Sequence, residues 1–275
     1  MDSSALQNRL ALHTWTLDTT PLSDALRIAR ETGWNAVELR RVDFTRAFEA
    51  GITNGEVLSL IRASGIKVAT LGTESGWIFA RGDERRRLLR VFEATCANAA
   101  ALGCDLVMSA PGPTVGGDVR QAAASLREAG DIARDHAVRH ALEFSSAHDV
   151  INRLDIAREI LALADHPNCG LVLDAYHLER SGAGGRAFED VPSRDIFAFQ
   201  YSDVPPAPSA PGRPVDRLPP GQGVVRWREI FQLLIEKNYA GYLSYEAPNP
   251  AHWSRPPDEV AREGVNATRA LLAAL

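Results

Sequence analysis

The chain has 275 residues, of which 45% are hydrophobic and 24% are charged, a composition typical of a soluble globular protein. Its formal net charge of −5 argues against a nucleic acid or an anionic membrane as the main partner. No apolar run approaches the roughly 18 residues of a membrane span. The N-terminal segment lacks a charged region followed by a long apolar core, and the three cysteines form no CxxC pair. We therefore expect a cytoplasmic protein with reduced thiols.

Short apolar runs alternate with stretches of helical periodicity along the chain. The predicted strands cover residues 9–15, 35–40, 65–72, 104–112, 140–144, 170–174, 196–200 and 242–246. The predicted helices cover residues 21–32, 56–64, 83–102, 119–136, 152–164, 188–194, 227–237 and 258–275. Glycines often end helices, and here they separate helical stretches from the next strand at Gly33, Gly65, Gly103, Gly170 and Gly241.

This alternation predicts an α/β fold. The number of strands, and the polar residues at the ends of many of them, favour a closed (β/α)8 TIM barrel over an open sheet. A barrel of this kind typically needs about 250 residues, which suits the chain length, and no linker divides the sequence. We therefore expect residues 1–275 to form a single TIM-barrel domain.

One predicted loop, residues 204–220, is unusual because it contains seven prolines. It is longer than the usual connection between elements, and loops of this length are commonly functional. A stiff surface excursion is the alternative. The loop directly follows a strand that ends in a possible metal ligand, which favours the functional interpretation.

Four strands in succession end in a residue that can donate oxygen to a metal: Glu143, Asp174, Gln200 and Glu246. The ends of the strands in a barrel converge on one face, so these side chains can meet. Three carboxylates at one point would repel one another, and a divalent cation relieves that repulsion. The all-oxygen set suits Mn²⁺ or Mg²⁺, with Co²⁺ and Zn²⁺ as alternatives. We expect one divalent metal ion.

His177 follows Asp174 by three residues, so a helical turn would point both side chains the same way. A histidine beside a metal suits general acid and base catalysis near neutral pH. Orienting a neighbouring group is the alternative role. Glu143, Glu246 and His177 are therefore the predicted catalytic residues.

Arg217 lies at the end of the proline-rich loop, where a guanidinium could bind a substrate oxygen, or simply form a surface salt bridge. Asp203, three residues after Gln200, is a second predicted substrate-binding residue. Polar and aromatic residues at earlier strand ends add His13, Glu38, Arg40, Glu74 and Trp77. Of these, we expect His13, Glu74 and Trp77 to contact substrate. Packing in the core is the alternative role for an aromatic ring.

Several segments resemble the xylose isomerase-like TIM-barrel superfamily. They are ALEF at Glu143, GLVLDAYH ending at His177, the QxxD of Gln200 and Asp203, DRLPPGQG at 216–223, and the strand that ends in Glu246. The resemblance covers nearly the whole chain, and is greatest to 2-keto-myo-inositol isomerases and 3-dehydroshikimate dehydratases. It implies metal ligation by the four oxygen donors, a place for His177 close to substrate, and contact of Arg217 with substrate oxygens.

Within this superfamily the third ligand separates two expectations. The isomerases and epimerases normally carry histidine there, whereas the dehydratases often carry glutamine, as this chain does at Gln200. The leading hypothesis is a metal-dependent isomerase or epimerase of a keto sugar or keto cyclitol that works through an enediolate. A lyase of the 3-dehydroshikimate dehydratase type is the second hypothesis, and a barrel that binds ligand without turnover is the third. The expected partner is a small polyol or keto acid, and a homo-oligomer is possible.

Overall fold

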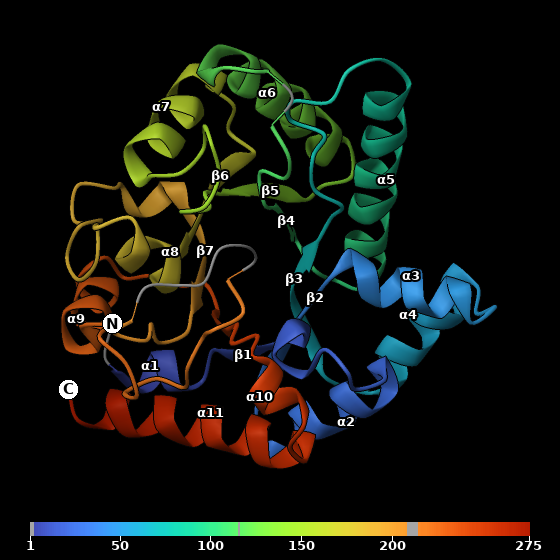
Figure 1. Cartoon of the computed structure of the whole chain (residues 1–275). Helices are drawn as coiled ribbons and strands as arrows, with labels where there is room; N and C mark the ends of the chain where they lie inside the picture. Colours follow the sequence, from blue (N-terminus) through green and yellow to red (C-terminus); the bar gives the residue numbers. More distant parts are fainter. Residues whose placement is uncertain (1–2, 115, 208–213) are drawn as a thin grey trace.

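In the computed structural model, which describes residues 3–114, 116–207 and 214–275, eight parallel strands close into a barrel in sequence order. Figure 1 shows the helices on the outside of this ring. The strands are β1 (Leu10–His13), β2 (Ala36–Leu39), β3 (Lys67–Gly72), β4 (Leu106–Ser109), β5 (Arg139–Glu143), β6 (Cys169–Asp174), β7 (Ile196–Tyr201) and β8 (Leu243–Tyr245). The predicted (β/α)8 TIM barrel is therefore confirmed.

Longer helices cover the barrel wall, and short ones follow several strands. The longer helices are α2 (Leu22–Thr32), α3 (Arg41–Glu49), α4 (Asn54–Ala63), α5 (Gly82–Ala101), α6 (Val119–Asp135), α7 (Leu154–Ala164), α9 (Trp227–Glu236) and α11 (Pro257–Ala273). The shorter ones are α1 (Ser3–Gln7), η1 (Thr14–Leu17), α8 (Ala175–Arg180), η2 (Ser193–Asp195) and α10 (Pro250–Trp253). In the described residues, no helix is both long and apolar enough to cross a membrane.

Local sequence explains where several helices begin and end. Thr53 and Glu56 cap the start of α4 reciprocally, each side chain bonding to the backbone N–H of the other. Asp118 caps α6 by accepting a hydrogen bond from the backbone of Gln121. The helix α2 ends at Gly33, whose φ of 93° lies in the left-handed region that glycine adopts freely.

The predicted helix over 188–194 is wrong. A helix instead begins directly after β6, because the Asp174 side chain accepts a hydrogen bond from Tyr176 N and caps α8. Pro192 disfavours helical geometry at the residue before it, and only the 3-10 turn η2 forms there. The helix α3 follows β2 in a stretch for which the sequence pattern predicts no element.

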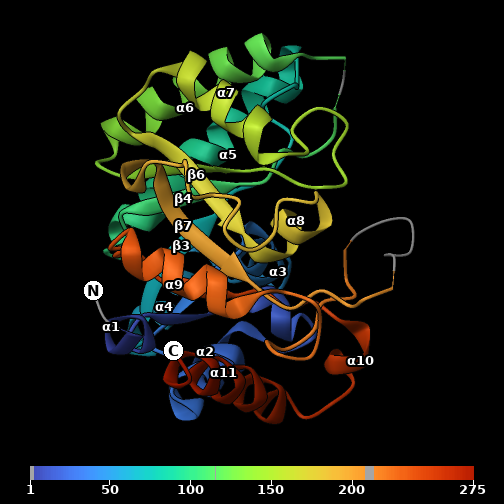
Figure 2. The same cartoon turned by 90° about the vertical axis from the view of Figure 1, so that its left-hand side faces the viewer.

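Two small clusters of side chains lie inside the barrel. One cluster inside the barrel contains Leu106, Met108, Ala141, Val172 and Ala198, and a second contains Ala11, Ala36 and Ala69. Helices α8 and α10, which follow β6 and β8, lie at the same end of the barrel (Figure 2). That end receives the carboxyl ends of the strands, where sites in this fold are built.

Candidate metal centre and active site

The strand ends deliver the predicted oxygen donors to the barrel interior. Ala141 and Val172 lie inside the barrel, and Glu143 and Asp174 follow them by two residues on β5 and β6. Side chains alternate along a strand, so these carboxylates face the same interior. Gln200 has the equivalent place on β7, two residues after Ala198. The exposed fractions of the predicted donors are 6% for Glu143, 0% for Asp174, 1% for Gln200 and 6% for Glu246.

A cavity of about 820 Å³ opens at this end of the barrel. Its volume lies within the roughly 300–1,000 Å³ of small-molecule sites. The wall includes Glu143, Gln200, Glu246, His13, His177 and Arg217. The structure therefore places most of the predicted site residues around one space that a small polyol could occupy.

The carboxylates of this cavity repel one another. Burial raises the pKa of Glu143 well above its ordinary value, and the neighbouring Glu246 and Asp174 raise it further. Burial also raises the pKa of Glu246, although Arg217 acts in the opposite direction. A cation among these groups would relieve both the burial and the repulsion.

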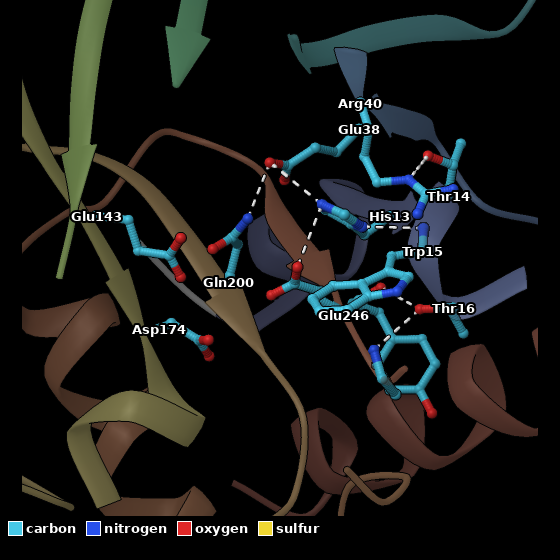
Figure 3. Close-up of polar contacts among 12 residues, drawn as sticks. His13, Thr14, Trp15, Thr16, Glu38, Arg40, Glu143, Asp174, Gln200 and Glu246 are labelled. Atoms are coloured by element: carbon cyan, nitrogen blue, oxygen red, sulfur yellow. Dashed lines mark hydrogen bonds and ion pairs between the residues drawn. The ribbon is translucent and has the colours of Figure 1, made fainter. Parts of the chain in front are cut away.

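The arrangement of these side chains fits a divalent metal. One ligand atom each from Glu143, Asp174 and His177 lie within 4.8 Å of one another. The Oε1 atom of Gln200 is buried, and it has no hydrogen-bond partner among the described residues. An unpaired amide oxygen that faces a group of carboxylates is suited to ligate a hard cation. In Figure 3 this oxygen lies on the side of Gln200 that faces Glu143.

Arg217 reaches the site, where one of its nitrogens is paired with carboxylates. Its Nη1 atom donates to Asp174 Oδ2 and to Glu246 Oε2, at 2.8 Å in each case. The guanidinium lies 4.4 Å from the centre of the Tyr176 ring, and only 1% of the residue is exposed. Although burial opposes its charge, Asp174 and Glu246 hold the pKa of Arg217 above its ordinary value. It therefore supplies a fixed positive charge beside the predicted ligands.

His177 projects from α8 next to the carboxylates. Its Nε2 atom lies 3.7 Å from Glu143 Oε1 and 3.3 Å from Arg217 Nη2. Its Nδ1 atom lies 3.0 Å from Ser146 Oγ, which fixes the ring from the opposite side. Burial, foremost, lowers the pKa of His177 to about 4, and Arg217 contributes. The imidazole is therefore neutral at pH 7 and able to exchange a proton with a ligand.

His13 enters the same cavity from β1. Its Nδ1 accepts a hydrogen bond from Trp15 N at 3.1 Å, so the neutral ring carries its proton on Nε2. That nitrogen lies 3.4 Å from Glu246 Oε1. Burial, foremost, lowers the pKa of His13 to about 3, and Arg40 contributes. Figure 3 shows His13 between Glu38 and Glu246.

Two of the predicted substrate-binding residues lie away from the cavity wall, and both predictions are corrected. Trp77 is fully buried, and it packs against Phe92 and His140 with ring-centroid separations of 5.6 and 5.5 Å. No part of this ring is exposed for a substrate.

Glu74 does line the cavity, where its carboxylate pairs with Arg87.

Asp203 is the second corrected residue. Its buried carboxylate accepts hydrogen bonds from the backbone N–H groups of Val204, Gly221 and Val225, and from Trp227 Nε1. All four donors belong to the segment that follows β7. The carboxylate is thus committed to holding this segment, and no oxygen remains for a substrate.

Glu38 is a site residue whose role the sequence pattern does not predict. It lies on β2, and its Oε1 accepts a hydrogen bond from Gln200 Nε2 at 2.9 Å. The pKa of Glu38 is raised to about 8, mainly by burial and in part by the charges of Glu246 and Asp174. The signal available in the sequence is its place at a strand end, two residues after the inward-facing Ala36.

Comparison with known proteins identifies the family of this chain. The model of the xylose isomerase-like TIM barrel family matches residues 26–271. The chain belongs to that family. The predicted resemblance is therefore confirmed.

Relatives within the xylose isomerase-like family support an isomerase. The inosose isomerase of Halalkalibacterium halodurans is 24% identical over 261 residues, which cover 92% of each chain. The inosose isomerase of Bacillus subtilis is 23% identical over 92% of this chain and 93% of its own length. A 3-dehydroshikimate dehydratase of Pseudomonas putida is 26% identical over 174 residues, which are 60% of this chain and 26% of that protein.

Solved structures share the fold. The IOLI protein, solved with a bound zinc atom, superposes with a TM-score of 0.84 at 22% identity over 97% of this chain and 98% of its own. The probable 3-dehydroshikimate dehydratase AsbF of Bacillus anthracis has a TM-score of 0.74 at 15% identity, over 95% and 98% of the two chains.

Proposed function

We propose that the protein is a divalent-metal-dependent isomerase or epimerase of a keto sugar or keto cyclitol. The observation that carries this proposal is the cluster of Glu143, Asp174, Gln200 and Glu246 at the mouth of the barrel. Within the described parts of the chain, the Gln200 amide oxygen has no hydrogen-bond partner. These four side chains would hold the ion, and His177 lies beside them. A bound divalent ion would supply Lewis acidity, which acidifies the C–H bond next to a keto group.

The residues of the cavity can carry the protons of such a reaction. The raised pKa of Glu246 and of Glu143 makes either carboxylate a stronger base than an exposed glutamate. We propose that one of them removes the proton from the carbon next to the keto group, which leaves an enediolate. The same proton, or one from solvent, returns to the other carbon or the other face. Neutral His177 is placed to pass a proton between the two substrate oxygens.

Arg217 would act mainly on charge. Its guanidinium holds Asp174 and Glu246 through Nη1. Its Nη2 atom faces His177, on the cavity side of the cluster. We propose that this second nitrogen reaches a substrate oxygen bound in the cavity.

A lyase of the dehydratase type is the second candidate, and the relative from Pseudomonas putida favours it. The same proton would leave the carbon next to the keto group. A β-hydroxyl would then depart as water with a proton from His177, and a carbon–carbon double bond would form. The product would absorb in the ultraviolet as an enone, whereas isomerisation produces no such chromophore.

Solvent exchange tests the proposal. In D2O with Mn²⁺, we expect the protein to exchange the hydrogen next to the keto group of a keto-inositol or ketohexose, followed by NMR. Glu246→Gln should slow this exchange about 100-fold or more, because the amide cannot take the proton. The matched control is Glu159→Gln on the exposed face of α7, which should leave the rate unchanged. Absence of exchange with every keto-polyol, with and without metal, would contradict the proposal.

A further inference from the structure

A hydrogen bond crosses the mouth of the barrel from β7 to β2. Gln200 Nε2 donates to Glu38 Oε1 at 2.9 Å, and each residue is 1% exposed. In the barrel order, β8 and β1 lie between these two strands, so the bond is no part of the sheet ladder. Figure 3 shows the contact as a dashed line above the predicted metal ligands.

This bond fixes the orientation of the Gln200 amide. An amide has a donor end and an acceptor end, and only the NH2 end can bond to a carboxylate oxygen that accepts. With the nitrogen turned to Glu38, the Oε1 atom points to the opposite side, where it is buried and unpaired. The reversed amide would turn the Gln200 carbonyl toward Glu38, and would present to Glu143 a nitrogen that has no lone pair for a metal.

The surroundings of Glu38 contain few other partners. His13 Nε2 lies 3.8 Å from the same Oε1 atom, beyond hydrogen-bond distance, and Ser244 is a polar neighbour on β8. The Oε2 atom has no hydrogen-bond partner among the described residues. A buried carboxyl group with so few hydrogen-bond partners lowers the stability of the fold. This indicates that Glu38 has a role in the site and not in folding.

We propose that Glu38 is a positioning residue that holds the Gln200 amide oxygen toward the metal. The inference rests on the proposed function, because it requires the ion to bind Gln200. Side chains that ligate metals commonly donate their remaining N–H to a carboxylate, and loss of such a partner typically weakens metal binding by about 10–100-fold. Glu38 itself does not touch the ion or the substrate.

Metal affinity tests this role without any assay of activity. The dissociation constant for Mn²⁺ is measured by titration calorimetry on the full chain carrying Glu38→Leu or Glu38→Gln. Leucine removes the acceptor, so we expect binding about 10–100-fold weaker. Glutamine keeps a carbonyl acceptor for Gln200 Nε2, so its affinity should stay within a few-fold of the wild type. Thermal unfolding of each metal-free variant shows whether it is folded.

A double substitution separates positioning from a general effect of the buried charge. If Glu38 acts through Gln200, then Glu38→Leu should not weaken Mn²⁺ binding further in a Gln200→Ala background. Additive losses would overturn the inference, and so would equal losses for Glu38→Leu and Glu38→Gln. If instead Gln200→Ala leaves the Mn²⁺ affinity unchanged, the proposed ligand set fails, and the inference fails with it.

Discussion

The hydroxyl of Thr16 in η1, just after β1, bonds to the backbone at the end of β8. Its Oγ1 donates to the carbonyl of Tyr245 at 3.0 Å and accepts from the backbone N–H of Ala247 at 2.9 Å. These backbone groups stand on either side of Glu246, and Thr16 is fully buried. One side chain therefore satisfies the two peptide groups that set the direction of a predicted ligand.

Replacement of Thr16 tests this connection. Thr16→Val keeps the size but leaves a buried donor and a buried acceptor unpaired. We expect the free energy of unfolding, measured in urea, to fall by about 1–3 kcal/mol. Thr16→Ser keeps the hydroxyl and should lose clearly less. Equal losses for valine and serine would show that packing, and not the hydrogen bonds, explains the effect.

For single residues, the sequence predicts the oxygen donors of the site better than it predicts the residues that hydrogen-bond to them. Glu143, Asp174 and Gln200 can be placed because each ends an apolar run whose alternation faces inward. The pairing of Gln200 with Glu38 spans 162 positions, and no local pattern encodes it. The contact of Arg217 with substrate stays a prediction, and its pairing with the carboxylates of Asp174 and Glu246 is likewise not encoded by any local pattern.

Among the elements, the segment after β7 is held at both ends. Asp203 pairs with Leu218 in an isolated antiparallel bridge, in addition to the hydrogen bonds of its carboxylate. Tyr176 Oη donates to Asp216 Oδ1 at 2.6 Å, which ties the same segment to α8. Both contacts flank Arg217 and bring it over the carboxylates. The expectation of a functional loop over 204–220 is consistent with this placement, although residues 208–213 lie outside the described part of the chain.

We expect Asp203→Asn to loosen this segment. The new amide nitrogen would face N–H donors in place of an acceptor oxygen, and the free energy of unfolding should fall by about 1–3 kcal/mol. Displacement of Arg217 should also lower kcat/KM in the exchange assay. Asp190→Asn, on an exposed aspartate, is the matched control and should change neither quantity. An unchanged unfolding curve for Asp203→Asn would contradict the structural role.

The strands are predicted more accurately than the helices that follow them. Each strand is a buried apolar run with polar neighbours, a signal that tertiary contacts reinforce. The start of α8 depends on one capping hydrogen bond from Tyr176 N to Asp174, a residue that the pattern already assigns to metal binding. Because the pattern assigns Asp174 to metal binding, its second role as the cap of α8 is not predicted from the sequence.

For the molecule as a whole, acid stability depends in part on a histidine between the barrel and its outer helices. His140 on β5 is fully buried, and its ring contacts Trp77 and Phe92 while Nε2 bonds to Ser109 Oγ at 2.8 Å. Burial lowers the pKa of His140 from 6.5 to about 3. Between pH 6.5 and about pH 3, His140 binds a proton in the unfolded chain but stays neutral in the folded protein. The free energy of unfolding therefore falls as the pH falls through this range.

This linkage predicts a difference in slope. From pH 6.5 to pH 5, His140 should reduce the free energy of unfolding by about 2 kcal/mol, at roughly 1.4 kcal/mol for each pH unit. The variant His140→Gln can still bond to Ser109 but does not titrate. Its unfolding free energy, measured in urea across this range, should decline less steeply than that of the wild type. Parallel declines would show that other groups govern the acid limit.

Three expectations about the whole molecule stay predictions. They are a single domain over residues 1–275, a cytoplasmic location and a possible homo-oligomer. The family model covers residues 26–271, and the barrel closes between β1 and β8, which agrees with one domain without testing its limits. The helix α11 packs against α1 and α2, so the end of the chain covers its beginning.

The position of Arg217 has a consequence for the stability of the metal-free protein. Asp174 and Glu246 already share a covalently attached cation, at 2.8 Å from each. The barrel therefore does not need a metal to keep these carboxylates together. We expect a chelator to strip the ion while the chain stays folded, and a later addition of metal to restore it. Under the proposed function, one divalent ion could then replace another without unfolding of the chain.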